Sequence, residues 1–211
     1  MQIIQATAAH TARYADEFVD LMHATGAPSF DYQFESRDLF DHVVNASWRT
    51  AGTLFAYDAT TLALDGDELL GIEVGFQAPE YEQRKKALAP LWSPLIESGA
   101  VSAEKLAEIA ARTYQCSYLN AAIPSHVYFI HALAVKASQR GKGIGAKLVH
   151  NALAKAAQAK LRALHLDVLS DNPAVGFYTS LGMQCLVEST APVPLQHGVP
   201  MQMRMAVNVA Y

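Results

Sequence analysis

The sequence has little cysteine, few charged residues and no long hydrophobic run. Its two cysteines, Cys116 and Cys185, lie far apart without a CxxC companion, which argues against a disulfide framework and a cysteine-based zinc site. Charged residues make up 17% of the chain, and 16 Lys+Arg against 20 Asp+Glu leave a net charge of -4. This balance argues against nucleic acid or an anionic membrane as the main partner. No window approaches the roughly 20 apolar residues of a membrane-spanning helix, so we expect a soluble cytoplasmic protein without a membrane partner.

Apolar residues, by contrast, are plentiful. Hydrophobic residues at 51% of a 211-residue chain are enough for a sizeable buried core and argue against intrinsic disorder. We therefore expect one globular domain over residues 1–211. The eight histidines are scattered singly, without the spacing of metal ligands, so we predict no metal site.

The hydrophobic pattern alternates between strands and helices along the chain. It predicts strands over 2–6, on both sides of an Asp65-Gly66 turn within 61–77, and over 126–135, 163–170, 184–190 and 200–209. It predicts helices over 8–26, capped by Thr7 and closed by Gly26, over 36–48, over about 144–158, and from Asn172 as N-cap to Gly182. Residues 79–121 have helical spacing, with a break at Gly99 and a cap at Ser102, and predict a helical insertion.

A glycine-dense segment, "VKASQRGKGIGAKL" over residues 135–148, separates the apolar strand at 126–135 from the next helix. Such a turn leaves backbone N–H groups free at the positive end of a helix, an arrangement that binds phosphate. A Walker loop is excluded, because Lys136 stands where its first glycine is needed and Gly143 follows Lys142 in place of Ser or Thr.

A dinucleotide-binding loop is a stronger alternative. Gly141, Gly143 and Ala146 satisfy G-x-G-x-x-A, and Asp167 follows at about the ~20 residues where a ribose-binding acid is expected. Against this, five residues separate Val135 from Gly141, whereas the dinucleotide loop turns directly off its strand. The loop also comes too late in the chain for a doubly wound sheet. A nicotinamide-dependent oxidoreductase stays open as a minor alternative.

The loop and its two flanking segments resemble the GNAT (GCN5-related) N-acetyltransferase superfamily. The cofactor signature of that family, Q/R-x-x-G-x-G/A, is matched by Arg140, Gly141, Lys142, Gly143, Ile144 and Gly145. "LAV" before it and "DNPAVGFYTSLGM" after it stand at the family's spacing, so the resemblance covers about residues 127–183. It implies an α/β fold with a mixed, mostly antiparallel sheet flanked by helices, here carrying the helical insertion at about 79–121.

The resemblance also implies a reaction. Acetyl-CoA would be the co-substrate, and its acetyl group would move to a primary amine of a small molecule or peptide by direct attack on the thioester. Its pantetheine arm would pair with an exposed strand edge and its pyrophosphate would lie on the loop N–H groups. The cofactor-binding residues so implied are Leu133, Ala134, Val135, Arg140, Gly141, Lys142, Gly143, Ile144, Gly145, Ala146, Asn172 and Tyr178. A non-catalytic acyl-CoA sensor is an alternative, and a homodimer is compatible with the sequence.

Two residues are the catalytic candidates. The resemblance assigns Tyr178 as the acid that protonates the departing thiolate, and a mere packing face of Phe177 and Tyr178 is the lesser alternative. His131 is a candidate base, expected on one strand face with Phe129, Leu133 and Val135, and a structural histidine is as good an interpretation. Some family members carry a glutamate where this chain has Phe129. Glu73 and Tyr57 are weaker candidates for the acceptor cleft.

Overall fold

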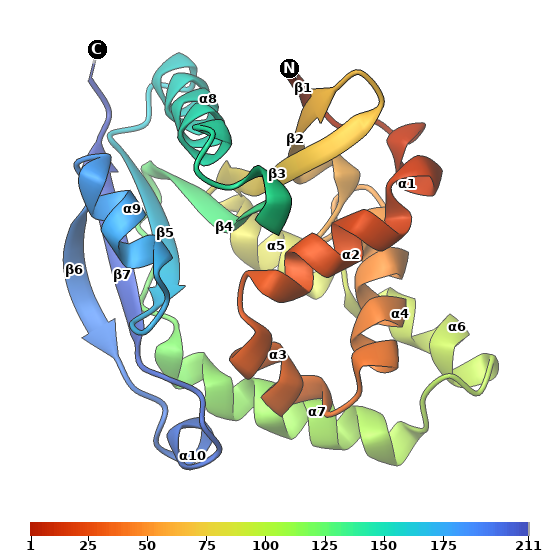
Figure 1. The fold of residues 1–211 in the computed structure, drawn as a ribbon. Helices are drawn as coiled ribbons and strands as arrows, with labels where there is room; N and C mark the ends of the chain where they lie inside the picture. Colours follow the sequence, from red (N-terminus) through yellow and green to blue (C-terminus); the bar gives the residue numbers. More distant parts are fainter. Residues whose placement is uncertain (211) are drawn as a thin grey trace.

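The computed structural model describes residues 1–210, which form a seven-stranded sheet between two layers of helices (Figure 1). The strands run in the spatial order β1-β2-β3-β4-β5-β7-β6, and β4 with β5 is the parallel pair among otherwise antiparallel neighbours. Their bounds are β1 Gln2–Gln5, β2 Thr60–Asp65, β3 Glu68–Gln77, β4 Val127–Val135, β5 Ala163–Leu169, β6 Gln184–Ser189 and β7 Gln202–Asn208. The mixed, mostly antiparallel sheet expected from the sequence is confirmed.

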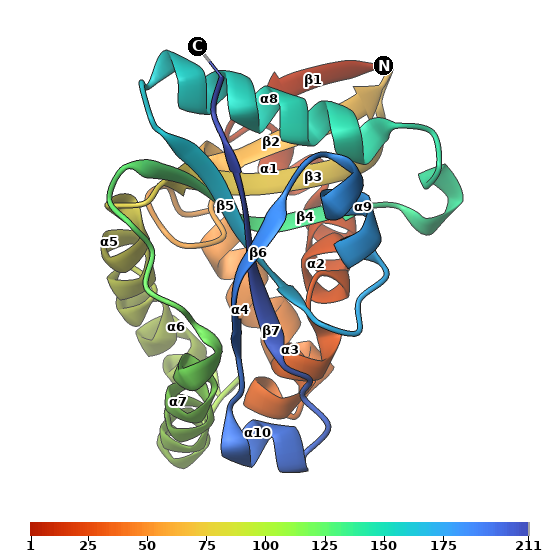
Figure 2. The same ribbon diagram turned by 90° about the vertical axis from the view of Figure 1, so that its left-hand side faces the viewer.

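Helices cover both faces of this sheet. They are α1 His10–Arg13, α2 Ala15–Ala24, α3 Ala27–Phe34, α4 Arg37–Trp48, α5 Glu80–Lys86, α6 Trp92–Glu97, α7 Ala103–Cys116, α8 Ile144–Gln158, α9 Ala174–Ser180 and α10 Pro192–Gln196. Figure 2 shows α8 on one side of the strands and α2 and α4 on the other. On the α2/α4 side, Phe18 and Trp48 stack at 4.0 Å in the larger core cluster. On the α8 side, Val149 and Ala152 pack with Leu164 in a second cluster.

The N-terminal helices depart from the prediction. In place of one helix over 8–26, α1 and α2 are separated at Tyr14, whose ring is buried and whose hydroxyl donates to Asp67 O at 3.1 Å. The expected Thr7 cap is wrong, because α1 begins only at His10 and the Thr7 N–H donates to His10 Nδ1 at 3.0 Å. Gly26 does not close α2 but begins α3, a helix that the sequence analysis missed.

Predictions based on local signals agree with the structure. The Asp65-Gly66 turn joins β2 to β3, with Gly66 at φ +55°. Ser102 caps α7 as expected, by accepting from the Lys105 N–H at 3.1 Å. Ser36 was expected inside the helix over 36–48 but is its cap, accepting from the Leu39 N–H at 3.3 Å. The helical insertion is present, because α5, α6 and α7 all lie between β3 and β4. The short helix α10, between β6 and β7, was not predicted.

Candidate active site

Strands β4 and β5 separate halfway along their length. Their pairing runs from Val127↔Ala163 to Ile130↔Leu166 and ends there, while β3 stays paired with β4 as far as Val135 (Figure 2). The Lys136 N–H donates to Leu70 O of β3 at 2.9 Å. Because alternate residues of a strand direct their main-chain groups to the same side, those of Val135 and Leu133 point away from β3. The edge of β4 is therefore open where β5 has left it.

A β-bulge lies at the point of separation. Val74 pairs with Ala132 but the next residue, Gly75, pairs with Ile130, so His131 is the extra residue of β4. A bulge shifts the alternation of side chains between the two faces of a strand. Phe129, His131 and Ala132 therefore face the α2/α4 layer, whereas Leu133 packs on the α8 side with Val135. The expectation that Leu133 and Val135 share a face with His131 is wrong for this reason.

The glycine loop after β4 forms an open anion cradle. Gly141 and Gly143 both take left-handed conformations, at φ +77° and +76°, and α8 starts at Ile144. Within residues 1–210, no acceptor bonds the backbone N–H groups of residues 141–146. Gly141, Lys142 and Gly143 are exposed, so the donors of these three residues face solvent. Six consecutive free donors with the positive end of a 15-residue helix suit a pyrophosphate.

Helices α8 and α9 are in close contact, and two further site candidates, Tyr178 and Asn172, lie in or just before α9. A Cβ on Gly145 would lie 3.2 Å from the Phe177 ring, so glycine permits this approach. Next to Phe177, the Tyr178 side chain is 6% exposed, and burial raises the pKa of its phenol to about 12. Asn172 behaves as the expected cap, because its Oδ1 accepts from the Ala174 N–H at 2.9 Å, although the helix proper starts at Ala174. Among the described residues, no group hydrogen-bonds the Tyr178 hydroxyl.

His131 lies in an aromatic surround. Its ring centroid is 5.5 Å from that of Phe55, 6.2 Å from those of Phe76 and Tyr81, and 6.4 Å from that of Phe129. Loss of hydration lowers the pKa of the His131 imidazole to about 4, so the ring is neutral at pH 7. A base with so low a pKa accepts a proton less readily than an ordinary histidine.

An ion pair beside the separation point was missed by sequence reasoning. Arg204 of β7 is 3% exposed and donates to both carboxylate oxygens of Asp167 on β5, at 2.5 and 2.9 Å. It also donates to the backbone oxygens of Ala121 and Ala122, at 2.7 and 3.0 Å. The sequence predicted Asp167 only as a ribose-binding acid of the dinucleotide alternative. In the structure both of its carboxylate oxygens are bonded by Arg204. The sequence feature that could have predicted this ion pair is Arg204 itself, because an arginine inside an otherwise apolar strand needs a buried acidic partner.

Glu73 does not share the surface of His131. It is fully buried on the α8 side of β3, accepting from Thr61 Oγ1 at 2.7 Å and from the Tyr128 hydroxyl at 3.0 Å, with Lys155 Nζ of α8 at 3.6 Å. Burial raises the pKa of this carboxyl, and the Lys155 ammonium and the two hydroxyl donors oppose the rise. Tyr57, the other weak candidate, packs at the margin of the α2/α4 cluster.

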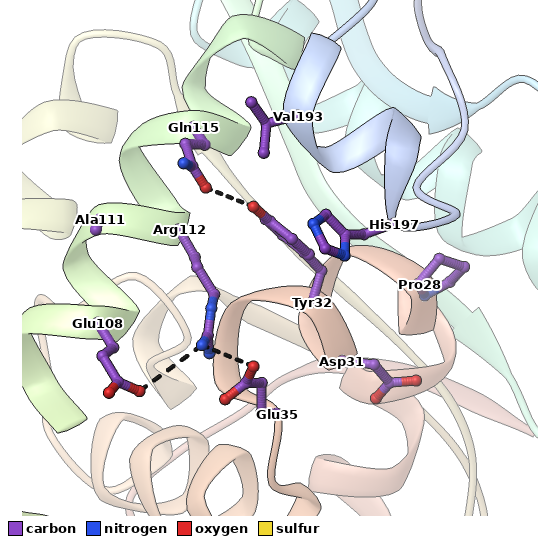
Figure 3. Close-up of a pocket in the computed structure, with 10 residues that line it drawn as sticks. All are labelled: Pro28, Asp31, Tyr32, Glu35, Glu108, Ala111, Arg112, Gln115, Val193 and His197. Carbon is purple, nitrogen blue, oxygen red and sulfur yellow. Dashed lines mark hydrogen bonds and ion pairs between the residues drawn. The ribbon is translucent and has the colours of Figure 1, made fainter.

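Two hollows lie in the surface, one beside the glycine loop and one away from it. One of about 260 Å³ adjoins the cradle, between α2 and the end of β4, where Lys136 Nζ pairs with Glu17 at 2.6 Å. The other, of about 710 Å³, lies between α3, α7 and α10 and contains none of the predicted site residues (Figure 3). There Arg112 lies between Glu35 and Glu108, and the Tyr32 hydroxyl donates to Gln115 (Figure 3).

Metal-binding clusters and membrane-spanning helices are both absent from residues 1–210. No group of three His, Cys, Asp or Glu side chains there is placed to hold a metal ion. No described helix is long and apolar enough to cross a membrane.

The comparisons with known proteins concern first the fold. An acetyltransferase structure without a named source is 18% identical and covers 100% of both chains at a TM-score of 0.69. An N-acetyltransferase from Staphylococcus aureus Mu50 is 16% identical, with 98% of this chain and 100% of that chain covered, at a TM-score of 0.72. A GCN5-related N-acetyltransferase from Kribbella flavida is 19% identical over 98% and 96%, at a TM-score of 0.56. At these identities the likeness is one of fold. A comparison with curated protein sequences finds no significant match.

Family membership follows from the sequence match and the sheet together. The doubly wound sheet of a dinucleotide-binding domain is not formed, because residues 1–210 contain one parallel pair, β4 with β5. The model of the acetyltransferase (GNAT) family matches residues 31–183, which include the separated strands, the glycine cradle and α9. The chain therefore belongs to the GNAT acetyltransferase family.

Proposed function

We propose that this protein is an acetyl-CoA-dependent N-acetyltransferase that acts on a primary amine of a small molecule or peptide. The family supports acyl transfer from acyl-CoA, and the proposal adds the acetyl group and the amine. The single observation that carries it is the open edge of β4 beside the free N–H groups of residues 141–146. An extended thioester arm and a diphosphate need these two features side by side.

In this proposal the chain's backbone holds the co-substrate. Leu133 and Val135 offer main-chain groups to the amides of the pantetheine arm, with Ala134 between them, and residues 141–146 offer free N–H donors to the diphosphate. The Arg140 N–H already donates to Ala137 O at 3.4 Å. Val135 O is at present bonded by Arg140 Nε at 3.2 Å, so the guanidinium moves when the arm binds. Asn172 keeps its side-chain NH₂ available while its Oδ1 caps α9.

The chemistry needs a neutral amine and a proton for the leaving group. Attack by the amine nitrogen forms the N–C bond and breaks the C–S bond, after which the thiolate takes a proton and the new amide loses one. We assign the donated proton to the Tyr178 phenol, which is neutral at pH 7. Burial raises its pKa to about 12, so it donates a proton less readily than an ordinary tyrosine. We assign the amine proton to His131 or to water. Acyl transfer of this kind requires no metal ligand from the chain.

A second candidate is supported by the state of His131. Its pKa of about 4 makes it a weak base, which favours an acyl-CoA sensor without turnover. The two candidates differ in thiol release, because a sensor binds acetyl-CoA but frees no CoA when amines are added.

Thermal unfolding with ligands followed by a thiol-release assay tests both. At 100 times its dissociation constant a ligand stabilises the folded state by about 2.7 kcal/mol, so acetyl-CoA should raise the melting temperature and NADH should not. Thiol release should then appear with at least one member of a broad amine panel. Stabilisation by NADH alone would contradict the proposal, and stabilisation by acetyl-CoA without thiol release would favour the sensor.

A further inference from the structure

Three polar side chains meet at the point where β4 and β5 separate. His131 and Asp167 each directly follow the last paired residues, Ile130 and Leu166. Both lie on the α2/α4 side of the sheet, since His131 faces Phe55 and the neighbours of Asp167 on β5 pack on the opposite side. The third is Tyr81 of α5, which belongs to the insertion between β3 and β4.

Tyr81 leans over this point from the insertion. Its ring centroid is 6.0 Å from that of Phe129, edge to face, and 6.2 Å from that of His131. Its phenol is close enough to Asp167 and Arg204 to interact with their charges. Arg204 also holds the backbone oxygens of Ala121 and Ala122, at the other end of the insertion. Both ends of the insertion are thus fixed beside the separated strands.

The surface these residues make is aromatic, and its buried carboxylate is paired. Phe55, Phe76 and Phe129 are buried beneath it, while His131 and Tyr81 remain partly exposed. The Asp167 charge is compensated by Arg204, and His131 is neutral. An ammonium group loses hydration on such a surface, which favours the neutral amine that acyl transfer requires. A polycation would lose the hydration of several charges on this surface, and the Asp167 carboxylate is already paired with Arg204.

We propose that Tyr81 determines acceptor specificity, forming with Phe55 and Phe129 a wall for primary amines with an apolar or aromatic side chain. This inference rests on the acetyltransferase function proposed above and names the acceptor class for it. Tyr81 belongs to the insertion between β3 and β4, so the insertion is an acceptor-binding element in this proposal. The side chain of the amine would pack on the Tyr81 ring while its nitrogen approaches the separated strands.

Steady-state kinetics with two amines test the proposal. The probes are 2-phenylethylamine and spermidine, each with acetyl-CoA, on the wild type, Tyr81→Phe, Tyr81→Ala and the control Tyr114→Ala. Tyr114 lies in α7 of the same insertion and is 70% exposed. We expect kcat/KM to favour 2-phenylethylamine by about tenfold or more, since apolar pocket contacts discriminate by 10- to 200-fold.

Tyr81→Ala should raise KM for 2-phenylethylamine by about tenfold with kcat and the KM for acetyl-CoA little changed. Tyr81→Phe and Tyr114→Ala should behave as the wild type. If Tyr81→Ala does not fold, as judged by its melting temperature, Tyr81→Leu replaces it. A preference for spermidine, or equal losses with both amines, would overturn the inference while leaving the acetyltransferase proposal intact. Failure of acetyl-CoA to stabilise the wild type would overturn both.

Discussion

Arg204 Nε lies 2.5 Å from Asp167 Oδ1, at the first position of β5 beyond its pairing with β4. The same guanidinium bonds the backbone oxygens of Ala121 and Ala122, so one side chain joins β5, β7 and the end of the insertion. The separated strands and the insertion are therefore parts of one connected arrangement.

Removal of the arginine should be strongly destabilising. In Arg204→Met the Asp167 carboxylate, 14% exposed, and two backbone oxygens lose their donor, and unpaired buried charges of this kind cost about 3–5 kcal/mol. Urea unfolding at pH 7 measures the loss. The double variant Arg204→Met/Asp167→Asn should recover part of the stability, because the unpaired charge is gone. Equal stabilities of the single variant and the wild type would contradict the role given to this pair.

Substitution of one loop glycine should separate backbone strain from ligand binding. Gly143→Ala forces a side chain into φ +76°, and the matched control Gly52→Ala does so at φ +79° in a turn before β2. Neither has an atom within 4 Å of the added Cβ, so each should lose about 1–2 kcal/mol of stability. Isothermal titration with CoA should show weaker binding for Gly143→Ala alone. Unchanged affinity in both variants would argue against a diphosphate on this loop.

Tyr178→Phe should reduce turnover without reducing co-substrate binding. The change removes only the phenolic oxygen, which no described group hydrogen-bonds, so the packing beneath α8 should persist. Because general acids contribute about 10²–10⁴ to rates, we expect kcat to fall by at least about 100-fold. The KM for acetyl-CoA and the melting temperature serve as controls. Wild-type turnover in this variant would assign Tyr178 to packing.

The folded state should become less stable as the pH is lowered from about 6.5 toward 4, because of His131. Its folded-state pKa of about 4 lies below the ordinary value of 6.5, so between these values the unfolded chain binds a proton that the folded chain does not. The contribution is complete above pH 6.5 and is lost as the pH falls toward 4, by up to about 3 kcal/mol.

Urea unfolding at pH 7, 6 and 5 tests this dependence. His131→Phe, which keeps an aromatic ring among the aromatic neighbours, should lose part of the slope. His165 is also buried with a pKa of about 4, so a residual slope is expected. Identical slopes in wild type and variant would show that the pKa of His131 is the same in the folded and the unfolded chain.

The features that could be predicted are those with a local cause. Ser36 and Ser102 cap helices because a side-chain oxygen reaches an N–H three residues on, and Gly66 turns a hairpin through its own conformation. The conformation of the loop glycines also has a local cause. Gly141 and Gly143 leave donors free whatever surrounds them.

The features that escaped prediction depend on residues distant in sequence. The bulge at His131 arises from its register with β3, and it moved Leu133 to the other face of the strand. The pairing of Asp167 with Arg204 joins residues 37 positions apart, and Tyr81 of the insertion lies near His131 of β4, 50 positions later in the chain. The hydrophobic periodicity of a single strand or helix cannot predict contacts between residues so far apart in the sequence.

The amino-acid sequence by itself thus determined the Ser102 helix cap, the hairpin and a glycine loop with free N–H groups, because each depends on the conformation of a few adjacent residues. The tertiary structure alone decided where β5 leaves β4, which face His131 occupies, and that Tyr81 of the insertion lies near His131 at the point of separation. These depend on strand register and on packing between segments far apart in the chain, which form only when the whole chain folds.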